Sequence, residues 1–316
     1  MISSVLLFIS GVVILLGGAN WFVDGSSSLA RRVGIPDIVT GLTVVAIGTS
    51  APELAVNLAA AIKGTAGMAI GNIVGSNILN IFLILGITAL IRPMQVERAS
   101  QRAEIPLVVL SGFVVLVMGS DRWLDGASTS VITRSEGFVL IAFLLIFMAY
   151  IFYIARSKNE TFSTASGRNV WLDLLKFFAG LAGLVVGSRF LVDGAVSIAH
   201  FLGISETVIG LTIVALGTSA PELATSAVAA WKGNSDIAVG NVIGSNLFNV
   251  FLILGITSIV QPLPAEPVLL RDFGVNIAAS LLLLLSTFTW GRMRIDRIEG
   301  GIFVILYIVY IVSMLL

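Results

Sequence analysis

Two short segments of this chain, GTSAPE at residues 48–53 and GNIVGSNILN at residues 71–80, decide the fold because both return later. The second copies are GTSAPE at 217–222 and GNVIGSNLFN at 240–249. The offset is 169 residues without a gap, both from Glu53 to Glu222 and from Asn80 to Asn249. Self-similarity at a fixed offset indicates an internal repeat. Each copy places one glutamate in an apolar run, where an ionisable group costs about 3 kcal/mol or more and by default marks an ion or substrate path.

The composition predicts an all-α polytopic membrane protein. Of its 316 residues, 57% are hydrophobic and 11% charged, whereas soluble domains carry about 25% charged residues. The absence of cysteine and the single histidine exclude disulfides, thiolate metal sites and a multi-histidine metal site. Residues 3–18 are apolar without a basic start or a small-residue cleavage site, so we expect a retained first helix rather than a signal peptide.

Hydrophobic segments long enough to span a bilayer, about 20 residues each, predict ten transmembrane helices. We expect five in a first repeat, residues 1–156, and five in a second, residues 170–316, joined by a cytoplasmic linker, 157–169. Because five is odd, the second repeat enters the membrane from the opposite side, an inverted topology typical of secondary transporters. The expected spans are 3–30, 37–62, 68–91, 104–120, 134–156, 171–199, 206–231, 237–260, 268–289 and 298–315.

Lysine and arginine set the orientation, since they accumulate in cytoplasmic loops. With the N-terminus outside, about thirteen fall in inner loops and four in outer loops, and Arg189 lies within a span. We therefore expect both termini to be extracytoplasmic, in a multi-pass protein of the cell membrane.

Several acids read as structural. Asp24 and its repeat equivalent Asp193 lie late in the long first helices, which favours an interfacial or capping role over ion binding. Asp37 and Glu206 open the second helix of each half, where an acid suits the helix dipole.

Four polar side chains are predicted to meet near the bilayer midplane. Glu53 and Glu222 lie about one turn past the centre of the second span of each half, within about 6 Å of it. Asn80 and Asn249 lie almost at the centre of the third. The pseudo-two-fold axis of an inverted repeat also lies at the midplane, so the glutamates should be symmetric around it.

A proline precedes each of these glutamates. Pro52 removes one N–H and clashes with the carbonyl of Gly48, and Pro221 does the same to Gly217. We expect both helices to break there, freeing carbonyls that something inside the protein must satisfy. Broken helices that aim carbonyls at the midplane are a known way to hold cations.

The resulting ligands are all oxygens, which suits Ca²⁺ or Na⁺ and not a soft transition metal. Two glutamates neutralise one Ca²⁺; if it leaves, two close negative charges remain at low dielectric. Sodium ions or protons must replace it, which favours exchange over free leak. The candidate ligands are the carboxylates of Glu53 and Glu222, the broken-helix carbonyls, the hydroxyls of Thr49, Thr218, Ser76 and Ser245, and the amides of Asn80 and Asn249.

Other features of the repeat have plainer readings. The pairs Gly71 with Gly75 and Gly240 with Gly244 let helices approach closely, and no Gly-Lys-Ser/Thr follows that would make a phosphate loop. Asn72 and Asn241 are expected to bond across helices outside the site. Asn57 has Ser226 as its repeat equivalent, so the sequence does not assign a role to the helix face on which they lie. The alternative to ion binding is a buried, neutral glutamate that is hydrogen-bonded to a neighbour. This could explain a single glutamate, but it explains a symmetric pair less well.

With both motifs doubled, the chain resembles the calcium/cation antiporter superfamily, and most of all the prokaryotic sodium/calcium exchangers, across nearly its whole length. The resemblance implies two inverted five-helix halves, with Ca²⁺ held by both glutamates and by the carbonyls of Thr49 and Thr218. It also implies that the two long first helices slide across the other eight. Sodium sites would add Ala46 and Ser76, Ala215 and Ser245, and the central pair Asn80 and Asn249.

One position departs from the family pattern. Many exchangers carry aspartate where this chain has Asn249, so the site keeps two formal negative charges, which weakens any case for potassium co-transport. The proton-coupled branch typically carries an acid at the positions of Ser76 and Ser245, so serine at both favours sodium coupling.

The sequence thus predicts a sodium/calcium antiporter that works by alternating access. A proton-coupled or broader divalent-cation antiporter is the alternative, and a cation channel is less favoured. We expect no enzyme activity, because no nucleophile–base pair is evident. We also expect no cofactor, no nucleic-acid partner and no obligatory protein partner; the partners are Ca²⁺, Na⁺ and the lipid bilayer.

Overall fold

The computed structural model describes residues 2–63, 66–157, 169–204, 213, 215–289 and 293–315. Within these residues the fold is mainly helical, and nine helices are long and apolar enough to cross a membrane. They match nine of the ten expected spans to within a few residues. Of the remaining expected span, 206–231, the structure describes residue 213 and residues 215–231. The linker lies mostly outside the described residues.

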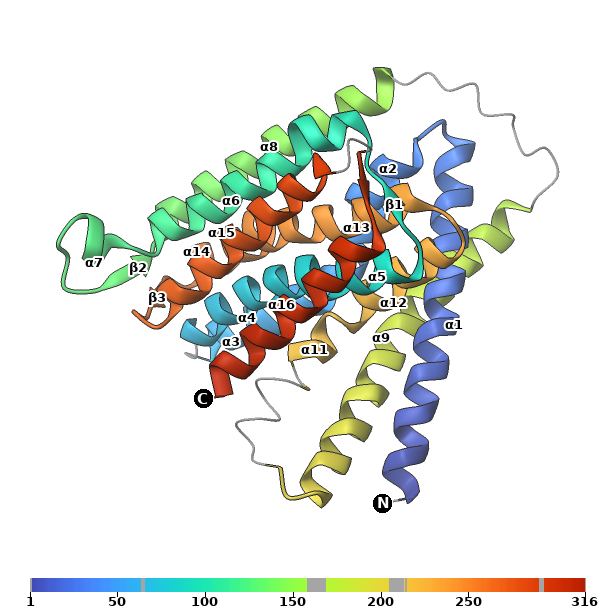
Figure 1. Ribbon diagram of the computed structural model, residues 1–316, viewed down its shortest axis with the longest axis horizontal. Helices are drawn as coiled ribbons and strands as arrows, with labels where there is room; N and C mark the ends of the chain where they lie inside the picture. The colour runs from blue at the N-terminus through green and yellow to red at the C-terminus, as the bar shows by residue number, and fades with distance from the viewer. Residues whose placement is uncertain are drawn as a thin grey trace.

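Among the described residues, the first half of the chain forms eight α-helices with three π-helical turns between them; these helices are coloured from blue to green in Figure 1. Its elements are α1 (Ile2–Arg32), α2 (Asp37–Thr40), η1 (Gly41–Val45), α3 (Ala46–Ile62), α4 (Ala66–Leu79), η2 (Asn80–Leu85), α5 (Gly86–Ile91), η3 (Ser100–Glu104), α6 (Ile105–Met118), α7 (Asp121–Leu124) and α8 (Arg134–Ser157).

The second half is described in part, and it again places a long helix before the repeated motifs. Its described elements are α9 (Val170–Phe201), α11 (Ala215–Thr218), α12 (Ala220–Trp231), α13 (Ser235–Phe248), η5 (Asn249–Leu254), α14 (Gly255–Val260), α15 (Leu269–Ser286) and α16 (Arg297–Leu315).

Two short antiparallel strand pairs join loops of the two halves. Strand β1 (Met94–Gln95) pairs with β4 (Arg294–Ile295), and β2 (Ser130–Ile132) pairs with β3 (Leu263–Ala265). Both pairs connect segments from different halves of the chain, so no local sequence pattern predicts them.

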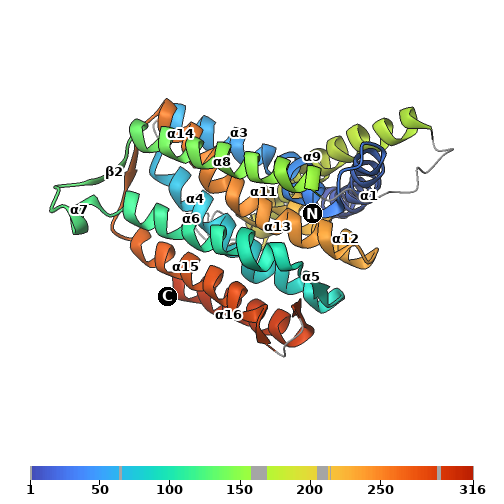
Figure 2. The ribbon, with the colours of Figure 1, turned by 90° about the horizontal axis from the view of Figure 1, so that it is seen from above.

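The two central helices are α4, continued by η2 and α5, and α13, continued by η5 and α14. Most residues of these two spans are buried, whereas α8 is peripheral and exposes many apolar side chains. Figure 2 shows α4 and α13 inside the bundle and α1 with α9 at one side of it. The central pair carries Ser76, Asn80, Ser245 and Asn249.

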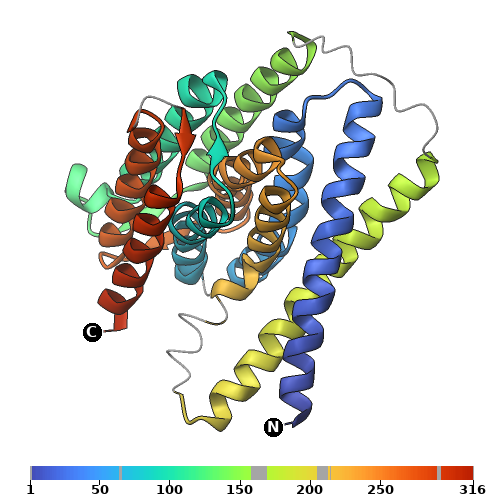
Figure 3. The ribbon, with the colours of Figure 1, turned by 45° about the vertical axis from the view of Figure 1, so that its right-hand side comes forward.

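Helices α1 and α9 cross in close contact, side by side (Figure 3). Glycine recurs every seven residues on both, which lets the backbones touch. A Cβ built on Gly18 would lie 2.7 Å from the carbonyl carbon of Gly183, and one on Gly187 would lie 2.5 Å from the nitrogen of Leu15. The glycines of this seam are Gly11, Gly18, Gly25, Gly180, Gly183, Gly187 and Gly194.

Ion pairs fasten the end of α1 to its surroundings. Asp24 pairs with Lys232 at 2.7 Å, in keeping with the interfacial reading of this acid. Arg32 pairs with the buried Asp173 of α9 at 2.8 Å. Asp37, the first residue of α2, pairs with Arg31 at 2.6 Å. Asp193 is exposed on α9, and Glu206 lies outside the described residues.

The seam between α1 and α9 gives a prediction about stability. Gly18→Ala should lower the free energy of unfolding by about 1–3 kcal/mol, the usual cost of overpacking, because its Cβ would meet the backbone of α9. Gly17→Ala is the matched control, since a Cβ there meets nothing within 4 Å. Thermal unfolding of the detergent-solubilised protein measures both. Equal midpoints for the two variants would contradict the close packing.

Candidate functional site

Each repeat holds the glutamate of the other. The Ser219 hydroxyl donates to Glu53 Oε1 at 2.7 Å, and the Ser50 hydroxyl donates to Glu222 Oε1 at 2.9 Å. The glutamates are 1% and 0% exposed, and their carboxyl groups lie close enough to interact directly. The two acids of the doubled motif therefore meet in one buried site.

Two further serines complete this layer. Ser245 Oγ lies 3.1 Å from the Ser50 hydroxyl, and Ser76 Oγ lies 3.3 Å from the Ser219 hydroxyl. The serines of α4 and α13 thus contact the same hydroxyls that hold the glutamates. The predicted residues Ser76 and Ser245 are both brought to the site.

Four asparagines cross-link the central helices beside the glutamates. Asn80 donates its amide to Asn246 Oδ1 at 3.3 Å, and Asn249 donates to Asn77 Oδ1 at 3.1 Å. Asn77 also donates to the backbone carbonyl of Asn246 at 3.3 Å. The pairings of Asn80 and Asn249 are again reciprocal, and they fix how both side chains are turned.

One oxygen on each central side chain has no hydrogen-bond donor among the described residues. These buried oxygens are Glu53 Oε2, Glu222 Oε2, Asn80 Oδ1 and Asn249 Oδ1. A buried polar atom without a partner costs about 1–3 kcal/mol, more for a charged group, so a set of four needs an explanation. Carboxylate and amide oxygens of this kind are the ligands that hard cations prefer.

Thr49 and Ala46 lie one turn apart on α3. The Thr49 hydroxyl lies 3.2 Å from Asn241 Oδ1 and 3.3 Å from the Ala46 carbonyl. Thr218 ends α11, one residue before Ser219. Ala215 begins α11, and its side chain lies outside the described residues.

The backbone carbonyls of the glutamates are held in two different ways. Asn57 donates to the Glu53 carbonyl at 2.7 Å. Its repeat equivalent, Ser226, instead accepts from Asn241 at 2.9 Å, and Asn241 donates to the Glu222 carbonyl at 3.3 Å. Asn241 therefore bonds across helices as expected, and it supplies the amide that Ser226 lacks.

The expected helix break occurs in only one copy. In the second, α11 ends at Thr218 and α12 starts at Ala220, with Pro221 in the first turn, where a missing N–H is tolerated. In the first, α3 runs unbroken through Pro52, so the predicted break there is wrong. The irregularity lies further upstream, in the π-helical turn η1; such turns are frequent at functional sites.

Comparisons with known proteins identify the family of this chain. The family model described as "Sodium/calcium exchanger protein" matches residues 3–153 and 172–316. The chain belongs to the sodium/calcium exchanger family. It is similar to the sodium/calcium exchanger MaX1 of Methanosarcina acetivorans, with 34% identity over 97% of both chains. It is also similar to the inner membrane protein YrbG of Escherichia coli, with 36% identity over 90% of this chain and 89% of that one.

A solved structure of the exchanger NCX_Mj, soaked with zero Na⁺ and Ca²⁺, matches with a TM-score of 0.83 and 36% identity over 99% of both chains. This family membership makes the chain a multi-pass membrane antiporter of cations, and its relatives are transporters rather than enzymes. The predicted resemblance is confirmed.

Sequence reasoning overlooked four residues of this candidate site, namely Ser50, Ser219, Asn77 and Asn246. All four are identical between the two copies, and that identity was the available signal. The described residues contain no group of three or more histidine, cysteine or acidic side chains that could hold a metal ion.

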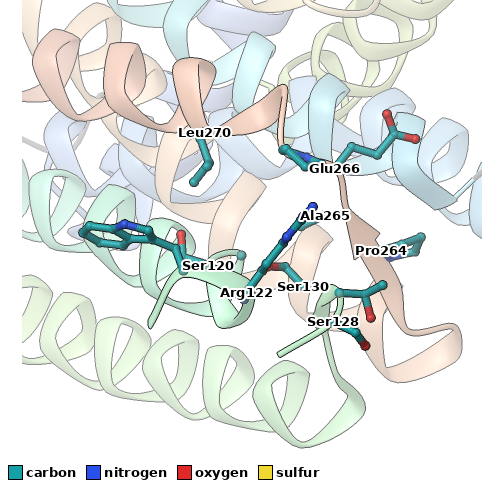
Figure 4. Close-up of a pocket in the computed structure, with 12 residues that line it drawn as sticks. Ser120, Arg122, Ser128, Ser130, Pro264, Ala265, Glu266 and Leu270 are labelled. Atoms are coloured by element: carbon teal, nitrogen blue, oxygen red, sulfur yellow. The ribbon is translucent and has the colours of Figure 1, made fainter. Parts of the chain in front are cut away.

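A separate cavity of about 440 Å³ lies among the loops around α7, β2 and β3 (Figure 4). Ser120, Arg122, Glu266 and Leu270 are among its lining residues. None of the residues that hold or contact the glutamates lines it, so it is not part of the candidate site.

Equivalent asparagines give a paired prediction. Asn241→Ala should lower the free energy of unfolding by about 1–3 kcal/mol, because Ser226, Thr49 and the Glu222 carbonyl lose a partner. Asn72→Ala, at the equivalent position, should change it much less, since the Asn72 amide nitrogen has no partner in the described structure. Thermal unfolding of both variants checks this. A larger effect at Asn72 would contradict the geometry.

Proposed function

We propose that the chain exchanges Ca²⁺ for Na⁺ across the cell membrane by alternating access at the buried glutamate pair. The observation that carries this is the reciprocal holding of Glu53 and Glu222, each with one carboxylate oxygen left without a donor. Sites of this kind, built of carboxylate, amide and carbonyl oxygens, suit Ca²⁺ and Na⁺.

The proposed ion ligands come from both repeats. They are the carboxylates of Glu53 and Glu222, the carbonyls at Thr49, Thr218, Ala46 and Ala215, the hydroxyls of Ser76 and Ser245, and the amide oxygens of Asn80 and Asn249. The donorless oxygens of Asn80 and Asn249 support their place in this set.

Charge is the reason for exchange rather than leak. One Ca²⁺ neutralises the two carboxylates. If it leaves alone, two negative charges remain at short range in a medium of low dielectric, where repulsion is strong. The return step therefore needs other cations in the site, which couples the two ion flows.

Sodium is favoured over protons as the coupling ion. Ser76 and Ser245 supply neutral oxygens next to the glutamates, where an extra acid would be expected for proton coupling. The similarity to a sodium/calcium exchanger of Methanosarcina acetivorans agrees. A proton-coupled calcium antiporter is the second candidate, since the same two carboxylates could take up protons.

Alternating access would follow from an inverted repeat of ten helices, with halves 1–156 and 170–316 and a cytoplasmic linker at 157–169. Both termini would then be extracytoplasmic. The repeat at constant offset and the distribution of lysine and arginine support this arrangement. The α1 and α9 pair, packed at one side of the bundle, is suited to sliding across it.

Replacing either glutamate should abolish calcium transport. Glu53→Gln and Glu222→Gln each remove a charged partner at a buried site, a change worth about 3 kcal/mol or more, so Ca²⁺ flux should fall about 100-fold or more. Asp24→Ala should reduce flux far less, because Asp24 pairs with Lys232 away from the site. Ca²⁺ uptake into proteoliposomes measures all three. Near-normal flux in either glutamine variant would refute the proposed site.

The coupling ion can be tested in the same vesicles. Ca²⁺ uptake should follow an imposed outward Na⁺ gradient at constant pH and should not respond to a pH gradient without Na⁺. Uptake that ignores Na⁺ and follows the pH gradient would establish the proton-coupled alternative, and uptake needing neither would indicate a channel.

A further inference from the structure

One hexapeptide has two conformations in this molecule. GTSAPE is helical throughout at residues 48–53, inside α3, whereas at 217–222 it is interrupted at Ser219, which has φ −97° and ψ 9°. Because the residues are identical, the difference must come from what packs against each copy.

A hydroxyl on α9 replaces a helical donor at the interrupted copy. The Ser188 hydroxyl donates to the Gly217 carbonyl at 2.6 Å. In a regular helix that carbonyl would accept from residue 221, but Pro221 has no N–H to give. Ser188 is 8% exposed, so water does not readily take its place as donor.

The uninterrupted copy lacks this donor. The position equivalent to Ser188 is Ala19, which is fully buried and has no hydroxyl. The helix contacts differ as well. A Cβ on Gly217 would meet Val192 of α9, whereas a Cβ on Gly48 would meet the ring of Phe22, whose equivalent is Leu191. Helices α1 and α9 thus sit against the two hexapeptides in different registers.

The bond also leads directly to the ion site. Gly217 lies two residues before Ser219, whose hydroxyl donates to Glu53. A displacement of α9 that breaks the bond at Gly217 would therefore shift the hydroxyl that holds the opposite glutamate. Since α9 is packed against α1 backbone to backbone, the two helices would move together.

We propose that Ser188 is a positioning residue that holds the second hexapeptide in its interrupted conformation and so biases the transporter toward the conformation seen here. This rests on the proposed function in one respect, that the two halves exchange conformations during transport. In the opposite conformation the Ser188 bond is broken and GTSAPE at 217–222 is continuous. No equivalent hydroxyl at Ala19 compensates, so the two conformations differ in stability.

The chain has no cysteine, which allows a clean distance measurement. Trp171 at the start of α9 and Trp231 at the end of α12 are 78% and 74% exposed, so spin labels at Trp171→Cys and Trp231→Cys should not disturb the fold. Pulsed electron paramagnetic resonance then gives the distance distribution between α9 and α12 in nanodiscs, without ions and with Ca²⁺.

In this background Ser188→Ala should move population from the main distance to a second one, with a change of roughly tenfold in their ratio, as expected for one buried hydrogen bond. Ser188→Thr, which keeps the hydroxyl, should stay close to the parent. Ala19→Ser, which adds the hydroxyl to the other copy, should shift the population in the same direction as Ser188→Ala, and the double variant should shift it further.

An unchanged distribution in Ser188→Ala, or the same shift in Ser188→Thr, overturns the proposal. If Ser188→Ala does not fold, Ala19→Ser alone decides, and an unchanged distribution again overturns it. The readout is independent of transport. Altered distances in a protein that does not exchange Ca²⁺ for Na⁺ would keep Ser188 as a positioning residue and refute the proposed function. Normal exchange of Ca²⁺ for Na⁺ with unaltered distances would support the proposed function and refute Ser188 as a positioning residue.

Discussion

The structure depends on placing two carboxylates side by side where water cannot reach them. Burying one such charge unpaired is expensive, and burying two adds their repulsion. Each carboxylate receives one hydroxyl donor, from Ser219 to Glu53 and from Ser50 to Glu222, and keeps one oxygen without a donor. The neighbouring Asn80 and Asn249 bond to other asparagines and also leave one oxygen each. The protein therefore supplies a surplus of acceptors that a cation can complete.

The sequence was sufficient for nine of the ten predicted spans, those that the described residues contain, and for the convergence of the glutamates. Bilayer thickness imposes a length on every apolar run, and the repeat places Glu53 and Glu222 at equivalent depths. The sequence was insufficient for the hydroxyl and amide pairings. The choice of serine that bonds each glutamate depends on how α3 and α12 face each other. The loop strands β1 to β4 and the π-helical turns were missed for a similar reason, since their partners or causes lie outside the local segment.

The proline motif shows where local reasoning fails most clearly. From sequence alone, GTSAPE predicts the same break in both copies, yet α3 is continuous and only the second copy is interrupted. No rule based on local residues can give two answers for one hexapeptide. The deciding difference is remote, a serine on α9 against an alanine on α1.

Equivalent positions at the helix ends differ in a related way. Asp24 of α1 pairs with Lys232 beyond α12, but the equivalent Asp193 and Lys63, both exposed, form no ion pair in the part of the chain that the structure describes. The hexapeptides, the Ser188 bond and this ion pair all separate one half from the other. Under the proposed alternating access, a repeat whose halves share a sequence but not a conformation would have a second arrangement, with the roles of the halves exchanged. The proposed alternating access needs such an asymmetry, because a fully symmetric arrangement would leave the central glutamates equally accessible from both sides of the membrane.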